Sequence, residues 1–230
     1  MKTGIIGAMA QEVEALTEGM ESVTIREIAG RKFYVGRYHG CDVVVVESGI
    51  GKVNAAVTAQ ILIDRFEIRS LINTGIAGAL SPRVNIGDVI LSTDVAQYDV
   101  DVTAFGHAPG QIPGMAMRTW TASDFLREAA AGVQIGGGRI YAGRIITGDR
   151  FLADDTEKRH LYQLWQADCV EMEGAAIAQT ASMNNIPFLV VRSISDKADG
   201  TADMDYDRFC GIASANSLAV INHLCNTNTI

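Results

Sequence analysis

The sequence predicts an α/β protein with one mixed, mostly parallel central sheet flanked by helices. Short apolar runs, some of them entirely β-branched like residues 43–46, alternate with longer segments of helical periodicity. Strands that alternate with helices in this way are typical of parallel sheets. The 230 residues can bury a complete core, and no linker, repeat or low-complexity segment divides them. We therefore expect a single domain over residues 1–230.

The expected elements follow one another along the chain. An apolar strand at residues 3–9 precedes an amphipathic helix at 11–20 and a hairpin at 25–38 that turns at Gly30-Arg31. This hairpin is the reason to expect a mixed sheet. Further strands are expected at 43–46, 70–74, 139–147 and 188–191, and further helices at 53–66, 174–184 and 205–224. Residues 101–117 contain two Pro and three Gly and predict a long loop, which in a compact domain is usually functional or packs on a partner.

Composition and charge exclude several classes of function. The formal net charge of −8, without a basic cluster, excludes nucleic acid and anionic membranes as partners. No apolar run is long enough to cross a bilayer, and the chain begins directly with a strand, so we expect a cytoplasmic protein. Neither the cysteines nor the histidines have metal-site spacing, so we expect buried, reduced thiols and no metal. The cysteines are Cys41, Cys169, Cys210 and Cys225.

Four carboxylates lie at or just beyond the ends of expected strands. Glu12 follows the first strand and Asp196 follows the last, while Glu171 and Glu173 follow another apolar run. Ligands of open α/β sheets bind at the carboxyl ends of the strands, so we expect these acids to meet and to act in acid/base catalysis. Simpler interpretations remain open, namely solvated edge residues for the two neighbouring glutamates and a helix N-cap for Asp196. Period-two spacing would also turn Met172 away from the face that Glu171 and Glu173 share, unless the chain turns there, as it must to begin the helix expected at 174–184.

Two glycine-rich turns and one aromatic residue also follow expected strands. Residues 49–52, Gly-Ile-Gly-Lys, suggest a phosphate-binding loop, but the full GxxxxGK[ST] spacing is absent, which favours a simple strand-to-helix turn. The glycines within residues 73–78 would let a ligand approach the backbone closely. Phe151, after the strand at 139–147, is either a stacking surface for a flat base or a core residue.

Six segments, taken in order, resemble the nucleoside phosphorylase/nucleosidase family, and within it the nucleosidases of 5′-methylthioadenosine and S-adenosylhomocysteine. The segments extend over most of the chain and comprise residues 4–12, 48–53, 73–75, 101–106, 170–173 and 192–196. The resemblance implies that water cleaves the N-glycosidic bond of an adenine nucleoside, with 5′-deoxyadenosine as a further candidate substrate. The products are adenine and, from the thio-substituted substrates, a 5-thio-substituted ribose. It implies no cofactor and no metal.

The resemblance also assigns roles to individual residues. Asp196 would protonate or hydrogen-bond N7 of adenine, Glu12 would activate the attacking water, and Glu173 would bind the ribose hydroxyls. Further substrate contacts are assigned to Ala8, Met9, Ile50, Ile76, Ala77, Gly78, Phe151, Leu152, Glu171, Met172, Ser195, Ala198 and Tyr206. A homodimer with a shared active site is implied, in which Val102, Phe105 and Pro113 come from the second subunit. Many relatives carry Ser at position 76, so Ile76 removes a hydroxyl near the base.

Three other functions fit parts of the sequence. A purine nucleoside phosphorylase would need cationic or glycine-rich groups for phosphate, for which Arg192 is a candidate unless it pairs with Glu171. A nucleosidase for another adenine nucleoside, such as aminodeoxyfutalosine, would use the same acids. A purine-binding regulator without enzymatic activity would not need Glu12, Glu173 and Asp196 together.

Overall fold

The computed structural model describes residues 2–227 and 229–230, apart from the side chains of residues 203–208. The strands are β1 (Thr3–Gly7), β2 (Glu21–Ile28), β3 (Arg31–Tyr38), β4 (Cys41–Glu47), β5 (Ser70–Ala79), β6 (Val89–Gln97), β7 (Thr119–Thr121), β8 (Ile140–Thr147), β9 (Cys169–Glu171) and β10 (Phe188–Asp196). The α-helices are α1 (Ala10–Glu18), α2 (Lys52–Phe66), α3 (Asp124–Ala130), α4 (Asp155–Trp165), α5 (Gly174–Met183) and α6 (Ala202–Asn226).

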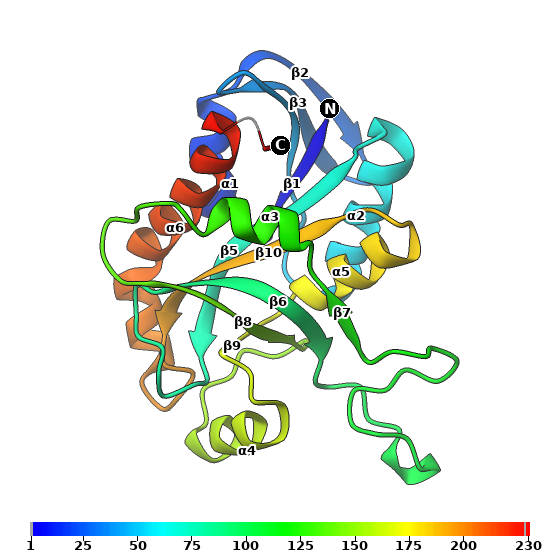
Figure 1. Ribbon diagram of the computed structural model, residues 1–230, viewed down its shortest axis with the longest axis vertical. Coiled ribbons are helices and arrows are strands. Elements are labelled where there is room, and N and C mark those ends of the chain that lie inside the picture. The colour runs from blue at the N-terminus through cyan, green and yellow to red at the C-terminus, as the bar shows by residue number, and fades with distance from the viewer. Residues whose placement is uncertain (1, 228) are drawn as a thin grey trace.

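All these strands belong to one twisted sheet (Figure 1). Its centre is parallel, because β4, β1, β5 and β10 lie side by side in the same direction. The β2–β3–β4 hairpins are antiparallel, as are the pairings of β6 with β10 and of β9 with β5. The predicted α/β fold with a mixed central sheet and flanking helices is therefore confirmed.

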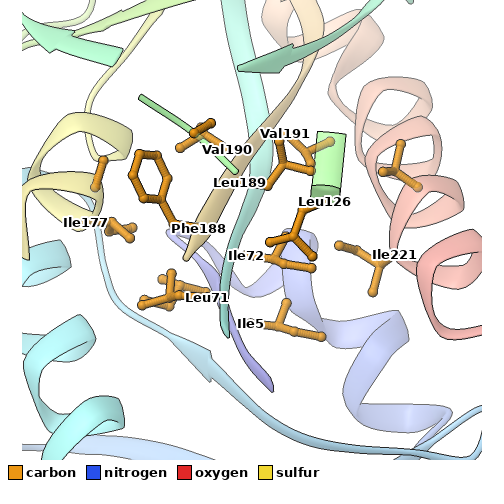
Figure 2. Close-up of a cluster of buried hydrophobic side chains, with 14 of the residues drawn as sticks. Ile5, Leu71, Ile72, Leu126, Ile177, Phe188, Leu189, Val190, Val191 and Ile221 are labelled. Carbon is orange, nitrogen blue, oxygen red and sulfur yellow. The ribbon is translucent and has the colours of Figure 1, made fainter. Parts of the chain in front are cut away.

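Helices cover both faces of the sheet. Helices α1 and α6 pack together on one side and α2 and α5 on the other (Figure 1). Successive side chains of a strand point to opposite faces of the sheet. Because helices cover both faces, β10 is buried along its whole length. Phe188 of β10 lies beside Ile177 of α5, whereas Leu126 of α3 and Ile221 of α6 lie on the opposite side of the strand (Figure 2). The polar residues Ser193, Ser195 and Asp196 follow these apolar residues at the other end of β10.

Several elements differ from the sequence-based expectation. Helix α6 begins at Ala202 rather than 205, and β6, β7, α3 and α4 have no counterpart among the expected elements. Both missed helices carry an N-cap in the sequence: Ser123 Oγ accepts a hydrogen bond from Leu126 N, and Asp154 Oδ1 accepts one from Glu157 N at 2.8 Å. Each of these helices buries only two residues, Leu126 and Ala130 in α3 and Leu161 and Trp165 in α4, which is too few to give a clear apolar periodicity.

The predicted loop at 101–117 is present between β6 and β7 and extends away from the body of the molecule (Figure 1). It contains one short 3₁₀ turn, Thr103–Phe105, and leaves the Phe105 side chain 84% exposed. The four cysteines are free, but Cys210 is partly exposed, so the expectation that all four are buried was wrong at this position. Among the described residues, no helix has the length and apolarity needed to cross a membrane.

Candidate active site

A cavity of about 490 Å³ opens where β1, β5, β9 and β10 end. It is lined by Ala8, Met9, Glu12, Ile50, Ile76, Ala77, Gly78, Phe151, Val170, Glu171, Met172, Glu173, Ser195 and Asp196. All of these except Val170 are among the site residues that the sequence analysis named. The structure therefore brings together carboxylates that lie far apart in the chain.

Glu12 lies in the first turn of α1, and three backbone amides hold its carboxylate. Its Oε2 accepts hydrogen bonds from Ala8 N at 2.6 Å and Met9 N at 3.0 Å, and its Oε1 accepts one from Ile76 N at 3.1 Å. Burial raises the pKa of Glu12 above its ordinary value, while the nearby charge of Arg192 and the three amides oppose that shift. A carboxylate held in this way is oriented toward the cavity and can accept a proton there.

Glu171 and Glu173 flank the point where β9 turns into α5. Glu171 Oε2 accepts hydrogen bonds from Glu173 N at 3.0 Å and Gly174 N at 2.7 Å, so it satisfies two backbone amides at the start of α5. Burial raises the pKa of Glu173 to about 7; the charge of Glu171 adds to this shift and that of Arg192 reduces it. The strand ends at Glu171 and the chain turns there into α5, as expected, so the Met172 side chain lines the same cavity.

Arg192 is the cation beneath these glutamates. Its side chain is 1% exposed, and its Nη2 lies 2.5 Å from Glu171 Oε2 and 3.8 Å from Glu173 Oε2. The pairing of Arg192 with Glu171, which the sequence left as an alternative to phosphate binding, is confirmed. The same nitrogen also donates to Asn73 Oδ1 at 2.5 Å. The Nη2 atom of Arg192 is therefore used in contacts with protein acceptors.

Asp196 is the last residue of β10 and is 2% exposed. Its Oδ1 accepts a hydrogen bond from Ala198 N at 2.7 Å, and Ser195 Oγ donates to its Oδ2 at 2.8 Å. The N-cap of α6 is Thr201, so the alternative interpretation of Asp196 as the helix cap was wrong. Its carboxyl group instead faces the cavity beside Gly78.

Comparison with known proteins identifies the family. Residues 2–226 match the family model described as "Phosphorylase superfamily". A curated 5′-methylthioadenosine/S-adenosylhomocysteine nucleosidase of Anoxybacillus flavithermus is 41% identical over 229 residues, which cover 98% of each chain. The chain belongs to the 5′-methylthioadenosine/S-adenosylhomocysteine nucleosidase family of this superfamily.

Solved structures of this nucleosidase family superpose closely. The enzyme of Neisseria meningitidis, in complex with methylthio-immucillin-A, has a TM-score of 0.94 and 39% identity and covers 98% of this chain and 99% of its own. The enzyme of Colwellia psychrerythraea 34H, in complex with adenine, has a TM-score of 0.94 and 38% identity, with 98% and 94% of the two chains covered. The fold of this chain is thus that of the nucleosidase family.

The remaining predicted residues of the nucleosidase site lie around or away from the cavity. Leu152 borders a small adjoining space of about 30 Å³ that also touches Phe151 and Asp196. Ala198 is buried and reaches the site through its amide, which donates to Asp196. Tyr206 lies outside the described side chains. Val102, Phe105 and Pro113 do not line the cavity within this chain.

Two further residues clarify how the cavity is lined. The Phe151 side chain is 47% exposed at the cavity, so its interpretation as a core residue was wrong. Val170, which the sequence analysis missed, lines the cavity from β9 immediately before Glu171. Its place in a short apolar run gave no sign of this, because the sequence does not show which residues of a buried strand end at a cavity.

The glycine-rich turn at 49–52 bears on how a member of this superfamily would treat phosphate. Gly49 and Gly51 have φ of +78° and +97°, which favour glycine, and the turn starts α2 as the simpler interpretation predicted. Its amides are taken by carboxylates, since Gly51 N donates to Glu173 Oε1 at 2.8 Å and Lys52 N donates to Asp149 Oδ1 at 2.8 Å.

Among the described residues, no three His, Cys, Asp or Glu side chains gather as a metal site would require.

Proposed function

We propose that this chain hydrolyses the N-glycosidic bond of 5′-methylthioadenosine and S-adenosylhomocysteine, releasing adenine and a 5-thio-substituted ribose. The observation that carries the proposal is the convergence of Glu12, Glu173 and Asp196 on one cavity of about 490 Å³. Membership of the nucleosidase family, at 41% identity over almost the whole chain, supports the same reaction and substrates.

The three acids suit the chemistry of glycosidic cleavage. Breaking the bond builds positive charge on the sugar, which carboxylates in a partly dehydrated cavity stabilise. Glu12, whose oxygens are fixed by three amides, takes a proton from the attacking water. Asp196 supplies a hydrogen bond or a proton to N7 of the leaving adenine. Glu173, whose pKa burial raises to about 7, accepts from or donates to the ribose hydroxyls.

Apolar and aromatic groups provide the remaining contacts. Phe151, exposed at the cavity, stacks on the adenine ring, and the backbone of Leu152 contacts the edge of the base. Met172 packs against the sugar. Met9 and Ile50 lie at the apolar side of the cavity, where the 5′-thio group binds. Ile76 offers the base an apolar surface in place of a hydroxyl.

Water rather than phosphate is the acceptor in this proposal. The guanidinium of Arg192 is paired with Glu171 and buried, and the amides at the start of α2 are held by Glu173 and Asp149. A phosphate ion in the cavity would also lie beside the carboxylate of Glu12, which would repel it. Each of these features disfavours phosphorolysis.

The direct test uses the purified chain and 5′-methylthioadenosine in phosphate-free buffer. Adenine and methylthioribose are expected in equal amounts, at a rate that added phosphate does not increase. A strict requirement for phosphate, with methylthioribose 1-phosphate as product, would instead show a phosphorylase. Parallel reactions with S-adenosylhomocysteine, 5′-deoxyadenosine and aminodeoxyfutalosine rank the substrates.

We also propose that the active form is a homodimer in the cytoplasm. Val53 and Val57 on α2 are exposed together with Ile50 at the cavity, forming an apolar strip beside the site. Phe105, in the 101–117 loop, is exposed and does not line the cavity of its own chain. Pairing two copies would cover these groups and bring the loop of one subunit over the site of the other. Free cysteines fit a reducing compartment.

A further inference from the structure

Asn73 is a buried polar residue that does not line the cavity. It lies on β5 with a side chain that is 0% exposed. Its Oδ1 accepts a hydrogen bond from Arg192 Nη2 at 2.5 Å, and its Nδ2 donates to the carbonyl oxygen of Ile6 at 3.0 Å. Both ends of the amide are therefore used, which is what a buried amide requires.

The two partners of Asn73 lead to different sides of the site. Ile6 is on β1, two residues before Ala8, whose amide holds the Glu12 carboxylate. Arg192 lies on β10 and pairs with Glu171. Asn73 thus connects the strand that positions Glu12 to the cation beneath the glutamates.

The direction of the Arg192 guanidinium matters because several acids share it. Its Nη2 lies 2.5 Å from Glu171 Oε2 and 3.8 Å from Glu173 Oε2, and its charge lowers the pKa of both Glu12 and Glu173. In a buried site, a small change in these distances alters the electrostatic interaction of each carboxylate with Arg192 and therefore its pKa. The titratable and charged groups that face this cation from the surrounding elements are Glu12, Cys169, Glu171 and Glu173.

We propose that Asn73 is a positioning residue: its side-chain amide fixes Arg192 relative to Glu12, Glu171 and Glu173 and thereby sets the pH range in which the site works. The inference rests on the proposed hydrolysis, in which Glu12 must be ionised to accept a proton from water. Asn73 acts through Arg192 and makes no contact with substrate.

The closing experiment compares Asn73→Asp and Asn73→Ala with the unchanged chain. An aspartate of similar shape adds a negative charge that attracts Arg192 but loses the donor to the carbonyl oxygen of Ile6, and alanine leaves the guanidinium without its acceptor. Both changes weaken the effect of Arg192 on Glu12, so the acidic limb of the kcat/KM–pH profile moves to higher pH. The expected shift for Asn73→Asp is about half a pH unit or more, larger than that for Asn73→Ala.

Thr74→Val is the matched control. Thr74 is the next residue of β5, is equally buried, and its hydroxyl has no hydrogen-bond partner in the structure. Its replacement tests a change in the same strand and leaves Asn73 and Arg192 in place, so the limb should stay where it is. An unmoved limb in both Asn73 variants, or an equal shift in Thr74→Val, would overturn the inference.

A second measurement separates this inference from the proposed function. Carboxyl ¹³C resonances of labelled glutamates, assigned with Glu12→Gln and Glu173→Gln, are titrated without substrate. Higher titration midpoints in folded Asn73→Ala, which adds no charge of its own, support the positioning role even if no adenine is released, in which case the proposed hydrolysis fails alone. If the midpoints of the Asn73 variants equal those of the unchanged chain, and the unchanged chain hydrolyses its substrate, the positioning role is rejected and the proposed hydrolysis stands.

Discussion

Gly75 leaves the space that the Glu12 carboxylate occupies. A Cβ built on Gly75 would lie 2.5 Å from Glu12 Oε1 and 3.0 Å from Arg192 Nη1. Gly78 stands in the same relation to Asp196, since a Cβ there would lie 2.7 Å from Asp196 Oδ1. These glycines of β5 were expected to let a ligand approach the backbone. In the structure, they make room for the acids.

Gly75→Ala is therefore expected to displace Glu12. The backbone of β5 is buried and cannot move away, so the carboxylate must leave its amide partners. We expect kcat to fall by at least about tenfold and stability to fall by about 1–3 kcal/mol, as overpacking of a well-filled interior typically costs. Steady-state kinetics and denaturant unfolding measure the two effects.

Gly211→Ala is the control for this substitution. Gly211 lies in α6, and a Cβ there would meet no atom within 4 Å. Alanine in a helix interior is about 0.5–1 kcal/mol more favourable than glycine, so this variant should be active and equally or more stable. Full activity in Gly75→Ala would show that Glu12 does not need its observed position.

Part of the fold and the site could be predicted because the determining signals are local. An apolar β-branched run predicts a buried strand, and an acid just after it lies at the carboxyl edge of the sheet; this reasoning named Glu12, Glu173 and Asp196. The structure brings these three acids to one cavity. The mixed sheet followed from the hairpin at 25–38, which the structure contains as β2 and β3.

Other features depend on contacts that the sequence does not display. Asn73 meets Arg192 across 119 positions of chain, and nothing near either residue indicates the pairing. Thr147, which donates to Glu171 Oε1 and accepts from Ala175 N at 2.8 Å, is equally hidden at the end of an ordinary strand. Residues that support a site from behind are found only when the strands are placed beside one another.

Glu12→Gln tests the general base. The amide keeps the shape of the side chain but cannot accept a proton from water, and its NH₂ group would oppose one of the amides that now hold the carboxylate. We expect kcat to fall roughly 10²–10⁴-fold while substrate still binds. Pre-steady-state binding of 5′-methylthioadenosine and steady-state kcat separate the two quantities. A nearly normal kcat would remove Glu12 from this role.

Asp196→Asn tests the general acid. Asparagine keeps the size of the side chain and can still accept from Ala198 N, but it cannot transfer a proton. Loss of general-acid assistance typically costs roughly 10²–10⁴-fold in kcat, with little change in affinity. Asp199→Asn is the control. Asp199 lies in the same loop between β10 and α6, accepts hydrogen bonds from Thr201 and does not line the cavity. Equal kinetic losses in both variants would assign Asp196 a structural role.

Phe105→Ala tests the shared site of the proposed homodimer. Its exposed side chain is expected to cover the 5′-substituent in the other subunit, so KM should rise more for 5′-methylthioadenosine than for adenosine. Phe125→Ala, on the exposed face of α3, removes a similar side chain outside the 101–117 loop and should leave the ratio of the two KM values unchanged. Sedimentation should show a dimer, and a fully active monomer would contradict the arrangement.

Glu173→Gln should make the protein more stable at alkaline pH relative to the unchanged chain. The ordinary pKa of a glutamate is 4.5, and burial raises that of folded Glu173 to about 7. Between these values the folded state holds a proton that the unfolded state has lost. The stability contributed by this proton is complete below pH 4.5 and is lost as the pH rises through 7, up to about 3 kcal/mol.

Glutamine does not titrate, so the variant lacks this loss. The difference in unfolding free energy, Glu173→Gln minus unchanged chain, should therefore be more positive at pH 8 than at pH 5. Urea unfolding at both pH values measures it. Glu14→Gln, which removes an exposed carboxylate from α1, controls for the change in net charge and should show no such difference between the two pH values. If Glu173→Gln behaves like Glu14→Gln, Glu173 is ionised in the folded protein at pH 5 and cannot serve as a proton donor to the ribose.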